Sequence, residues 1–359
     1  MRRWVCLVLL LLTAACHKAA DAPTATNLDD INLGDTVEDP AYAAPGEALA
    51  RTVSASAIGE MVPVVSMQTI DGDTIDLGEI YGNKPVYIKF WATWCVPCRQ
   101  QTPAFEKAYQ TYGDKLEVIA LNIGLSDDEA SVRKFRDMYG MTMPIVMDDG
   151  HLAQLFDLRV TPQHVLIGKD ARIAYIGHAE NQALADAIAR VVNQQGSADV
   201  QLAPMQPAAT VFKIGDTITG LELTTSSGVR FPLRGDGPER IRAVVFFSSW
   251  CEWYLEKTRP GTARACARVR EEIEELARQA SNIDWLGVAG GPWSTAEDLA
   301  DYQKNNKVSI PIGLDVSGTL FRALDVRDIP TVVLIDGAGK VLQVIGPEID
   351  LKDAIARDT

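Results

Sequence analysis

The sequence has little of what several large classes of protein require. Its 359 residues carry 34 Lys and Arg against 48 Asp and Glu, which gives a net charge of −14. Phosphate recognition needs clustered basic residues, so this charge argues against a nucleic-acid partner. Only four histidines are present, no Ser–His–Asp signature occurs, and Ala289-Gly-Gly-Pro292 lacks the Lys and Ser/Thr of a phosphate-binding loop. We therefore expect no cofactor.

Long hydrophobic runs are also missing. The apolar stretch near the N-terminus extends only from Trp4 to Leu12, whereas about 20 residues are needed to span a bilayer. Met-Arg-Arg precedes this stretch and Thr13-Ala-Ala-Cys16 follows it, a pattern that is typical of an export signal. We expect a signal peptide at 1–15 and a protein on the periplasmic side of the bacterial envelope.

The residues before Cys16 are small and resemble a bacterial lipobox, although Thr13 replaces the commoner Leu. This predicts lipidation of Cys16 and a protein that is anchored to the membrane without spanning it. The alternative interpretation is ordinary cleavage beside a chance cysteine.

Cysteine is sparse, and its positions are informative. Cys6 leaves with the signal, and the folded body keeps two pairs, Cys95/Cys98 and Cys251/Cys266. An exported protein meets an oxidising compartment. A Cys-x-x-Cys pair there is structural, metal-binding or redox-active, and its surroundings must decide between these roles.

The first pair lies in the run Tyr87-Ile-Lys-Phe-Trp-Ala-Thr-Trp-Cys-Val-Pro-Cys-Arg99, in which an apolar strand leads directly into an amphipathic segment. This order places Cys95 at a helix N-terminus, where unpaired N–H groups and the helix dipole favour an anion. We expect Cys95 to be a nucleophilic thiolate. Cys98, one turn further along, is placed to attack the mixed disulfide and release the substrate.

The body of the chain shows one pattern of strands and helices twice. We predict a flexible tether at 16–55, a first domain at 56–195, a linker at 196–210 and a second domain at 211–359. Strands that alternate with helices predict an α/β fold, with a central mixed sheet flanked by helices in each domain. A hairpin signal at the start of each copy predicts an N-terminal β-hairpin.

The spacing of the motifs supports a duplication. Cys95 lies 67 residues before Pro162, and Cys251 lies 79 residues before Pro330. We expect the extra residues just after Cys251, where Lys257-Thr-Arg-Pro-Gly261 interrupts the helical pattern.

The run Phe90-Trp-Ala-Thr-Trp-Cys-Val-Pro-Cys98, the hairpin before it and Val160-Thr-Pro162 beyond it resemble the thioredoxin superfamily. The resemblance is closer to the TlpA/ResA-like branch of exported thiol–disulfide oxidoreductases, and it implies two tandem thioredoxin-like domains. It also implies a cis bond at Thr161-Pro162 beside the thiols, where the backbone docks the substrate. The substrate-binding residues are then Trp94, Pro97, Thr161 and Pro162, and Trp91 helps to shape the site.

Partners follow from the same resemblance. It implies a disulfide-containing protein as substrate, such as an apocytochrome or a copper-site protein, and a membrane thiol as electron donor. The Val-Pro dipeptide between the cysteines resembles that of reducing members, so we predict a reductase.

Two positions depart from the family pattern. Lys89 stands where thioredoxins carry a buried carboxylate, and Gln101 stands where ResA-like proteins often carry Glu. Lys89 either points towards the thiols, where its charge would lower a thiol pKa, or extends to solvent. We favour the second interpretation.

The second copy keeps Cys251 but has Tyr254 where the resolving cysteine would stand. Cys266 is the candidate partner, and a chain break at Pro260-Gly261 would let it turn back. Three interpretations remain open: a structural disulfide, a displaced redox pair, or two unpaired thiols. Pro330 corresponds to Pro162.

Two other classes of function compete with thiol–disulfide exchange. A Cu(I) or metal chaperone would use Cys95 and Cys98 as ligands, with His164 as a third. The competing interpretation of His164 is a surface-facing strand residue, which we favour, so no metal site is predicted. A peroxiredoxin-like peroxidase is the weaker alternative, because Ala92 stands where that family needs Thr.

Overall fold

The computed structural model describes residues 40–196, 200, 202–204, 209–234, 240–279 and 282–355. The expected signal peptide and the lipidation site at Cys16 lie outside the described residues. Within the described ranges, no helix is both long enough and apolar enough to cross a membrane.

The first domain is built on a five-stranded mixed sheet with the strand order β5-β4-β3-β6-β7. Strands β3, β4 and β5 run parallel, β6 pairs antiparallel with β3, and β7 pairs antiparallel with β6. A two-stranded hairpin, β1-β2, precedes the sheet. The strands are β1 (Ser66–Gln68), β2 (Thr74–Asp76), β3 (Val86–Trp91), β4 (Glu117–Asn122), β5 (Ile145–Met147), β6 (Gln163–Ile167) and β7 (Ile173–Gly177).

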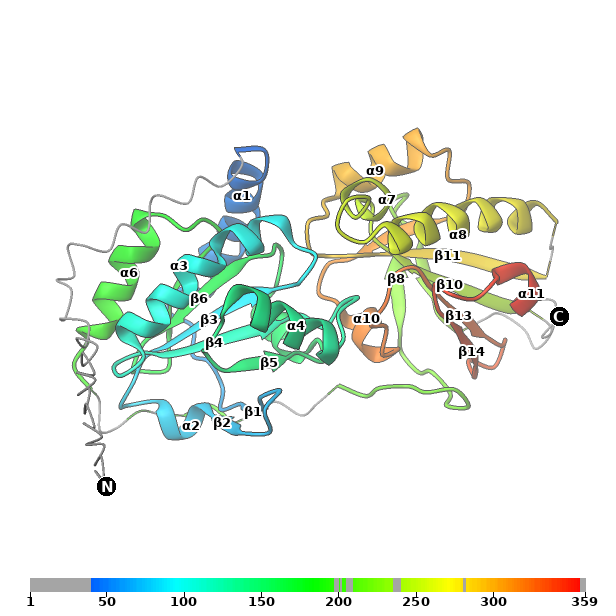
Figure 1. Ribbon diagram of the computed structural model, residues 1–359. Coiled ribbons are helices and arrows are strands. Elements are labelled where there is room, and N and C mark those ends of the chain that lie inside the picture. The colour runs from blue at the N-terminus through cyan, green and yellow to red at the C-terminus, as the bar shows by residue number, and fades with distance from the viewer. Residues whose placement is uncertain are drawn as a thin grey trace, which may run out of the picture. The chain divides into compact units, whose positions relative to one another are not determined.

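The second domain repeats this topology, with the order β12-β11-β10-β13-β14 and a hairpin β8-β9. Its strands are β8 (Glu222–Thr224), β9 (Arg230–Pro232), β10 (Ile241–Phe247), β11 (Ile283–Gly290), β12 (Ile312–Asp315), β13 (Thr331–Ile335) and β14 (Val341–Ile345). The predicted fold class is therefore confirmed. In Figure 1 the colours run from cyan to green through the first sheet and from lime to red through the second, so each sheet comes from its own part of the chain.

Helices connect the strands in the same order in both domains. Those of the first domain are α2 (Leu77–Ile80), α3 (Val96–Tyr112), α4 (Glu129–Tyr139), α5 (His151–Leu155) and α6 (Gln182–Val192). Those of the second domain are α7 (Cys251–Tyr254), α8 (Pro260–Gln279), α9 (Ala296–Asn305), α10 (Thr319–Ala323) and α11 (Leu351–Ile355). The break expected near Pro260-Gly261 is present, because α7 ends at Tyr254 and α8 begins at Pro260.

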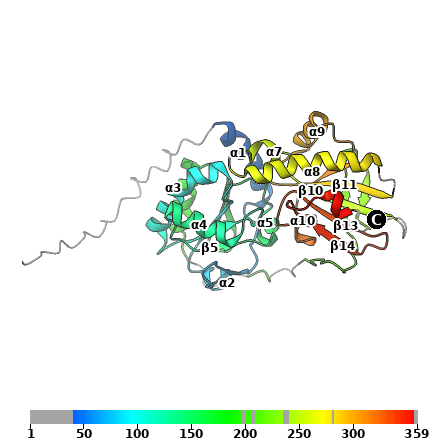
Figure 2. The ribbon, with the colours of Figure 1, turned by 45° about the vertical axis from the view of Figure 1, so that its right-hand side comes forward.

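The central strands are buried on both faces, as their continuous apolar runs require. Every residue of β3 and of β10 is buried. Alternate residues of β10 enter two separate cores: Val245 packs in a cluster with Val269 and Ile273 of α8, and Val244 packs in a cluster with the hairpin residue Leu223. Both ribbon views show α8 lying across one face of the second sheet (Figures 1 and 2).

The expectation of a flexible tether at 16–55 was wrong for residues 40–55, while residues 16–39 lie outside the described part of the chain. The range predicted as a flexible tether contains a helix, α1 (Pro40–Ala57), whose residues Ala50 and Val53 are buried. The Glu47 carboxylate accepts hydrogen bonds from the backbone N–H groups of His178 and Ala179, at 3.0 and 3.1 Å, just beyond β7. Alanine is the best helix former, and burial against β7 stabilises a segment that has little periodicity of its own.

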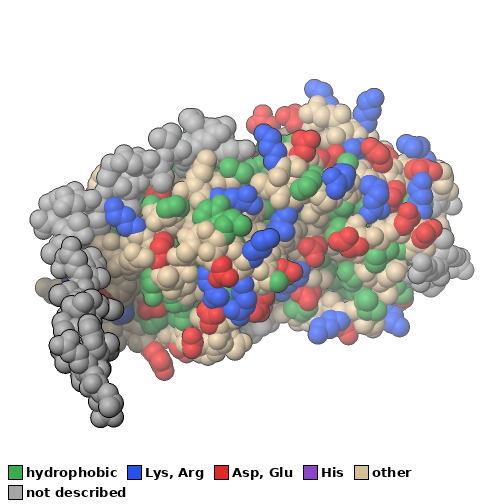
Figure 3. Space-filling model, viewed as in Figure 1, with side chains coloured by type: hydrophobic (Ala, Val, Ile, Leu, Met, Phe, Trp, Pro, Cys, Tyr) green, Lys and Arg blue, Asp and Glu red, His purple; other side chains and the backbone are tan. Residues whose placement is uncertain are grey.

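Charges of both signs cover the surface. On the face drawn in Figure 3, Lys and Arg side chains are interspersed with Asp and Glu and do not gather in a basic patch.

Candidate active site

Cys95 occupies the N-cap position of α3, at the point where β3 ends. Its Sγ lies 3.2 Å from the backbone N of Cys98, whose N–H points at the sulfur. Cys95 and Cys98 form a disulfide, with their Cα atoms 5.2 Å apart. In the reduced chain the same N–H group would stabilise a Cys95 thiolate, since a helix N-terminus favours an anion.

The peptide bond between Thr161 and Pro162 is cis, as the resemblance implies. The carbonyl oxygen of Thr161 lies 3.4 Å from Cys95 Sγ, so the structure brings the predicted docking backbone next to the predicted nucleophile. Pro162 is held from behind, because the Nδ1–H of His178 donates to its carbonyl oxygen at 2.7 Å.

Trp94 and Pro97 lie within the same turn. Trp94 is buried, and its indole N–H donates to the carbonyl oxygen of Leu125 at 2.8 Å. Pro97 is in the first turn of α3, where a missing N–H costs nothing. Trp91, at the end of β3, packs against Phe135 of α4 with ring centroids 4.8 Å apart.

Three buried side chains form a chain of hydrogen bonds behind the disulfide. Gln101 Nε2 donates to the carbonyl oxygen of His178, which leaves Gln101 Oε1 to accept from His164 Nε2–H at 3.0 Å. His164 Nδ1 then accepts from the Tyr87 hydroxyl at 2.7 Å. Gln101 thus fixes the tautomer of a neutral histidine.

The favoured interpretation of His164 as a surface residue was wrong, because its side chain has no exposed surface. Burial, and secondarily the charge of Lys89, holds its pKa well below the usual range for histidine. Both ring nitrogens are engaged, so His164 does not offer a lone pair to a metal beside the two cysteines. No group of three or more His, Cys, Asp or Glu in the described part of the chain is arranged to hold a metal ion.

The favoured interpretation of Lys89 was also wrong. Lys89 is only 2% exposed and does not reach solvent. Its Nζ lies over the ring of Phe105 of α3, 5.0 Å from the centroid. Because β3 is central and buried on both faces, a side chain in its middle has no route to the surface.

Sequence reasoning missed Asp127, which positions the residue two before Cys95. The Asp127 carboxylate is fully buried and accepts from the backbone N–H of Thr93 at 2.7 Å, from the Thr93 hydroxyl and from Asn122 Nδ2. Arg259, from the second domain, forms an ion pair with it at 2.7 Å. No pattern in the sequence links these residues, since they lie far apart along the chain.

The comparisons with known proteins agree with this geometry. A family described as AhpC/TSA matches residues 58–176. The chain is similar to the thioredoxin-like protein YneN of Bacillus subtilis, with 44% identity over 91 residues, which are 25% of this chain and 53% of YneN. It is also similar to the thiol-disulfide oxidoreductase ResA of Geobacillus kaustophilus, with 30% identity over 125 residues, which are 34% of this chain and 70% of ResA.

The chain belongs to the TlpA/ResA-like branch of the thioredoxin superfamily. It spans about half of the length of YneN. Among solved structures it is similar to StoA of Bacillus subtilis, at 25% identity and a TM-score of 0.32, over 36% of this chain and 99% of StoA. The AhpC/TSA match ends at residue 176, well before the second domain.

The second domain of this ResA-like chain carries a disulfide of its own. Cys251 and Cys266 are bonded, with their Cα atoms 6.3 Å apart, so the interpretation as two unpaired thiols was wrong. The bond links α7 to α8 across the break in the helical pattern. The peptide bond Ile329-Pro330 of the second domain, which corresponds to Thr161-Pro162 of the first, is cis as well.

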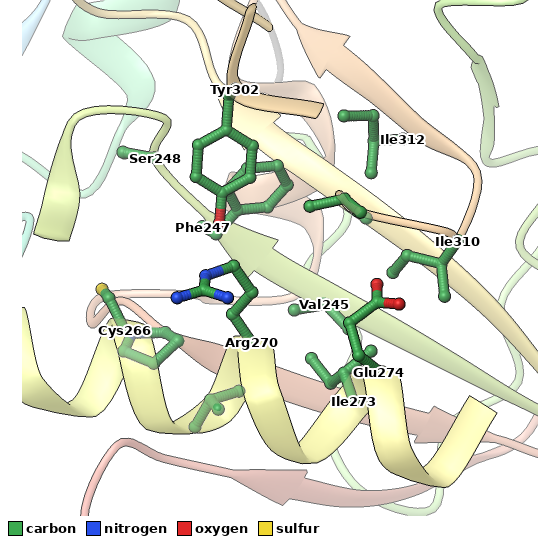
Figure 4. Close-up of a pocket in the computed structure, with 14 residues that line it drawn as sticks. Val245, Phe247, Ser248, Cys266, Arg270, Ile273, Glu274, Tyr302, Ile310 and Ile312 are labelled. Atoms are coloured by element: carbon green, nitrogen blue, oxygen red, sulfur yellow. The ribbon is translucent and has the colours of Figure 1, made fainter. Parts of the chain in front are cut away.

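The space beside this second disulfide is small. Cys266, Pro330, Tyr302 and Arg270 line a cavity of about 30 Å³, shown in Figure 4. A water needs roughly 10–15 Å³ by this measure, so the cavity has room for water and none for a polypeptide. Arg270 forms two hydrogen bonds with Glu252, at 2.8 and 3.1 Å, which tie α8 to α7.

Side chains of the second domain cover the first disulfide. Cys95 is 0% exposed and Cys98 is 1% exposed. The hydroxyl oxygen of Tyr254 accepts from the backbone N–H of Val96 at 2.9 Å, and the indole N–H of Trp293 donates to the carbonyl oxygen of Thr161 at 3.0 Å. Neither contact was expected from the sequence.

Proposed function

We propose that this chain is a thiol–disulfide oxidoreductase that reduces disulfides of proteins in the bacterial cell envelope. The observation that carries the proposal is the placement of Cys95 at the N-terminus of α3, with the Cys98 N–H 3.2 Å from its sulfur. A thiolate there is stabilised at neutral pH, and only the thiolate attacks a disulfide. Family membership supports the same activity.

The reaction begins with Cys95 and Cys98 reduced. The Cys95 thiolate attacks one sulfur of the substrate disulfide, a mixed disulfide forms, and the other substrate sulfur leaves as a thiolate. Cys98 gives up its proton and attacks Cys95 Sγ, which breaks the mixed disulfide and releases the second substrate sulfur. The proton ends on a released substrate thiolate, so that one substrate thiol and one substrate thiolate are formed. Two electrons have then passed to the substrate, and the Cys95–Cys98 disulfide is the oxidised product.

Individual groups are assigned roles by their positions. The backbone of Thr161 and Pro162 docks the substrate beside Cys95, and Trp94 and Pro97 shape the approach. Gln101 does not titrate, so it cannot take the Cys98 proton as a carboxylate would. It accepts from His164 Nε2–H and so holds the neutral ring in one tautomer and orientation, which makes it a positioning residue.

The direction, the partners and the location belong to the same proposal. The Val96-Pro97 dipeptide favours a reductase, which requires a membrane dithiol to re-reduce the chain. Apocytochrome c and copper-site proteins are the proposed substrates. The N-terminal pattern that ends in Cys16 supports export and a lipid anchor. We assign exchange to the domain at 56–195 and a docking role to the domain at 211–359.

The decisive experiment traps the intermediate. The Cys98→Ser variant should accumulate a mixed disulfide with a protein disulfide such as insulin, because nothing resolves it. The Cys95→Ser variant is the matched control and should trap nothing. A reduced wild-type chain that leaves insulin oxidised, and a Cys98→Ser variant without a mixed disulfide, would refute the proposal.

Two further measurements separate the alternatives. A reduction potential near −120 mV, the value for DsbA, would make the chain an oxidant. Consumption of hydrogen peroxide by Cys95 at a rate that exceeds insulin reduction would instead support a peroxidase.

A further inference from the structure

The predicted nucleophile is buried, and two side chains of the second domain bind the backbone beside it. Cys95 has no exposed surface, although an exchanging thiol must meet a second sulfur in line with its own. Tyr254 and Trp293 both reach the active-site backbone from the second domain.

These two side chains bind the backbone groups on either side of the Cys95 sulfur. Tyr254 Oη accepts from the N–H of Val96, the residue after Cys95. Trp293 Nε1 donates to the Thr161 carbonyl oxygen, which itself lies 3.4 Å from Cys95 Sγ, and to the Thr161 hydroxyl at 3.2 Å. A disulfide that approaches Cys95 must therefore pass the place where these two side chains are bound.

The position of Tyr254 in its own domain is informative. It lies three residues after Cys251, just as Cys98 lies three residues after Cys95. The second motif has thus lost a resolving thiol, and its tyrosine hydroxyl contacts the active helix of the first domain. Its ring lies 6.3 Å from Trp94 and 5.7 Å from Trp250, both at perpendicular geometry.

The two side chains also have room to move. Both line a cavity of about 470 Å³, together with Trp250, Trp253 and residues of α1. Trp293 holds a positive φ of 57°, which is uncommon for a residue with a side chain. Strained conformations of this kind are concentrated at switch regions and binding sites.

We propose that Tyr254 and Trp293 form a gate over Cys95 that selects polypeptide disulfides. This rests on the proposed exchange activity. When the gate opens, the N–H of Val96 and the C=O of Thr161 lose these two hydrogen-bond partners. An extended polypeptide offers a backbone C=O and N–H to replace them, whereas a small disulfide without amides does not. A site with unpaired polar groups rejects the ligand that cannot satisfy them.

The first test measures access to Cys95 by alkylation, which needs no exchange activity. The fully reduced chain is treated with iodoacetamide at neutral pH, and labelling of Cys95 is followed by peptide mass spectrometry. Tyr254→Ala/Trp293→Ala should label at least about tenfold faster than the wild type, because both hydrogen bonds and both rings are gone. Equal rates would overturn the gate.

Two variants make the comparison specific. Val229→Ala is the control, since Val229 is 58% exposed in the second domain, does not line this cavity, and should leave the labelling rate unchanged. Tyr254→Phe retains the ring and removes the hydroxyl, and an intermediate rate would measure the hydrogen bond to Val96. A wild-type chain whose Cys95 labels as fast in its native state as in guanidinium would also refute the gate, even where the double variant fails to fold.

The second test measures selectivity. The reduced wild type should reduce a cystine-bridged peptide at least about tenfold faster than bis(2-hydroxyethyl) disulfide, and this ratio should fall in Tyr254→Ala/Trp293→Ala. An unchanged ratio would contradict the selective role. If Cys95 of the double variant labels rapidly and yet exchanges with neither disulfide, the proposed oxidoreductase activity fails while the gate remains.

Discussion

Trp94 and Trp250 pack against each other with ring centroids 5.1 Å apart, and they hold equivalent positions in the two domains. Each precedes the first cysteine of its motif. Each also donates its indole N–H to a loop carbonyl of its own domain, Trp94 to Leu125 at 2.8 Å and Trp250 to Pro292 at 3.0 Å. The two cysteine motifs thus contact each other through tryptophans at equivalent positions of the repeat.

Two backbone hydrogen bonds between the domains also join corresponding loops in a reciprocal way. The N–H of Ser126 donates to the carbonyl oxygen of Arg327, and the N–H of Trp293 donates to that of Arg159. Arg159 and Arg327 each lie three residues before a cis-proline, and Ser126 and Trp293 both have positive φ. This is the pattern of an isologous interface between two copies, here made within one chain. The faces that carry the first cysteine and the cis-proline of each domain are therefore the faces that meet in the interface.

We expect Arg259→Met to weaken this interface. The variant leaves the buried Asp127 carboxylate without its cation, although Thr93 and Asn122 still donate to it. A loss of about 1–3 kcal/mol in unfolding free energy should follow, together with faster alkylation of Cys95. Urea unfolding measures the first effect, and Arg264→Met, which replaces an exposed arginine of α8, serves as the control.

Asp148 should make stability dependent on pH. Burial raises its pKa from 3.8 to about 6, despite hydrogen bonds from the N–H groups of Leu152 and Ala153. The folded chain holds this proton more tightly than the unfolded chain, so the contribution is complete below pH 4 and is lost as pH rises through 6. Between pH 4 and 7 the unfolding free energy of the wild type should therefore fall by about 3 kcal/mol because of Asp148, and the Asp148→Asn variant should lack this fall. Parallel stability profiles for the two proteins from pH 4 to 7 would contradict the assignment.

Lys89→Met should raise the pKa of His164. Burial is the main cause of the low pKa of this histidine, and the Lys89 charge is the second. Removing the charge should move the pKa upward while burial keeps it below 6.5. NMR titration of the His164 ring measures this, and Lys84→Met, at a half-exposed lysine just before β3, should leave the value unchanged. A titration of Cys95 in the same Lys89→Met variant tests whether the ammonium also acts on the thiols.

The Cys251–Cys266 disulfide should be structural. It closes a loop with a sequence separation of 15 residues, for which chain entropy predicts about 3 kcal/mol of stability. Cys251→Ser/Cys266→Ser should lose that amount in urea unfolding and still reduce insulin through Cys95 and Cys98. Loss of insulin reduction in a variant that remains folded would instead support a redox role for the second pair.

The strands and the redox motif were predictable because their signals are local. The apolar run at 86–91 and the turn into Cys95 lie within a dozen residues, and the repeat of this pattern disclosed the second domain. Helix α1 was missed because its Ala-rich sequence has weak periodicity, and only packing on β7 decides its state. Lys89 and His164 were wrongly predicted to be exposed, because a polar residue in a strand is expected to face solvent. Only the central position of β3 and β6 in the sheet shows that both side chains are buried.

The amino-acid order alone predicts which sulfur attacks, since a helix that starts at Cys95 follows from neighbours in the chain. What covers that sulfur was decided by tertiary structure. Val96 and Tyr254 are 158 residues apart, and Thr161 and Trp293 are 132 apart. A hydrogen bond over such a separation depends on how two folded domains pack, and no local pattern encodes it.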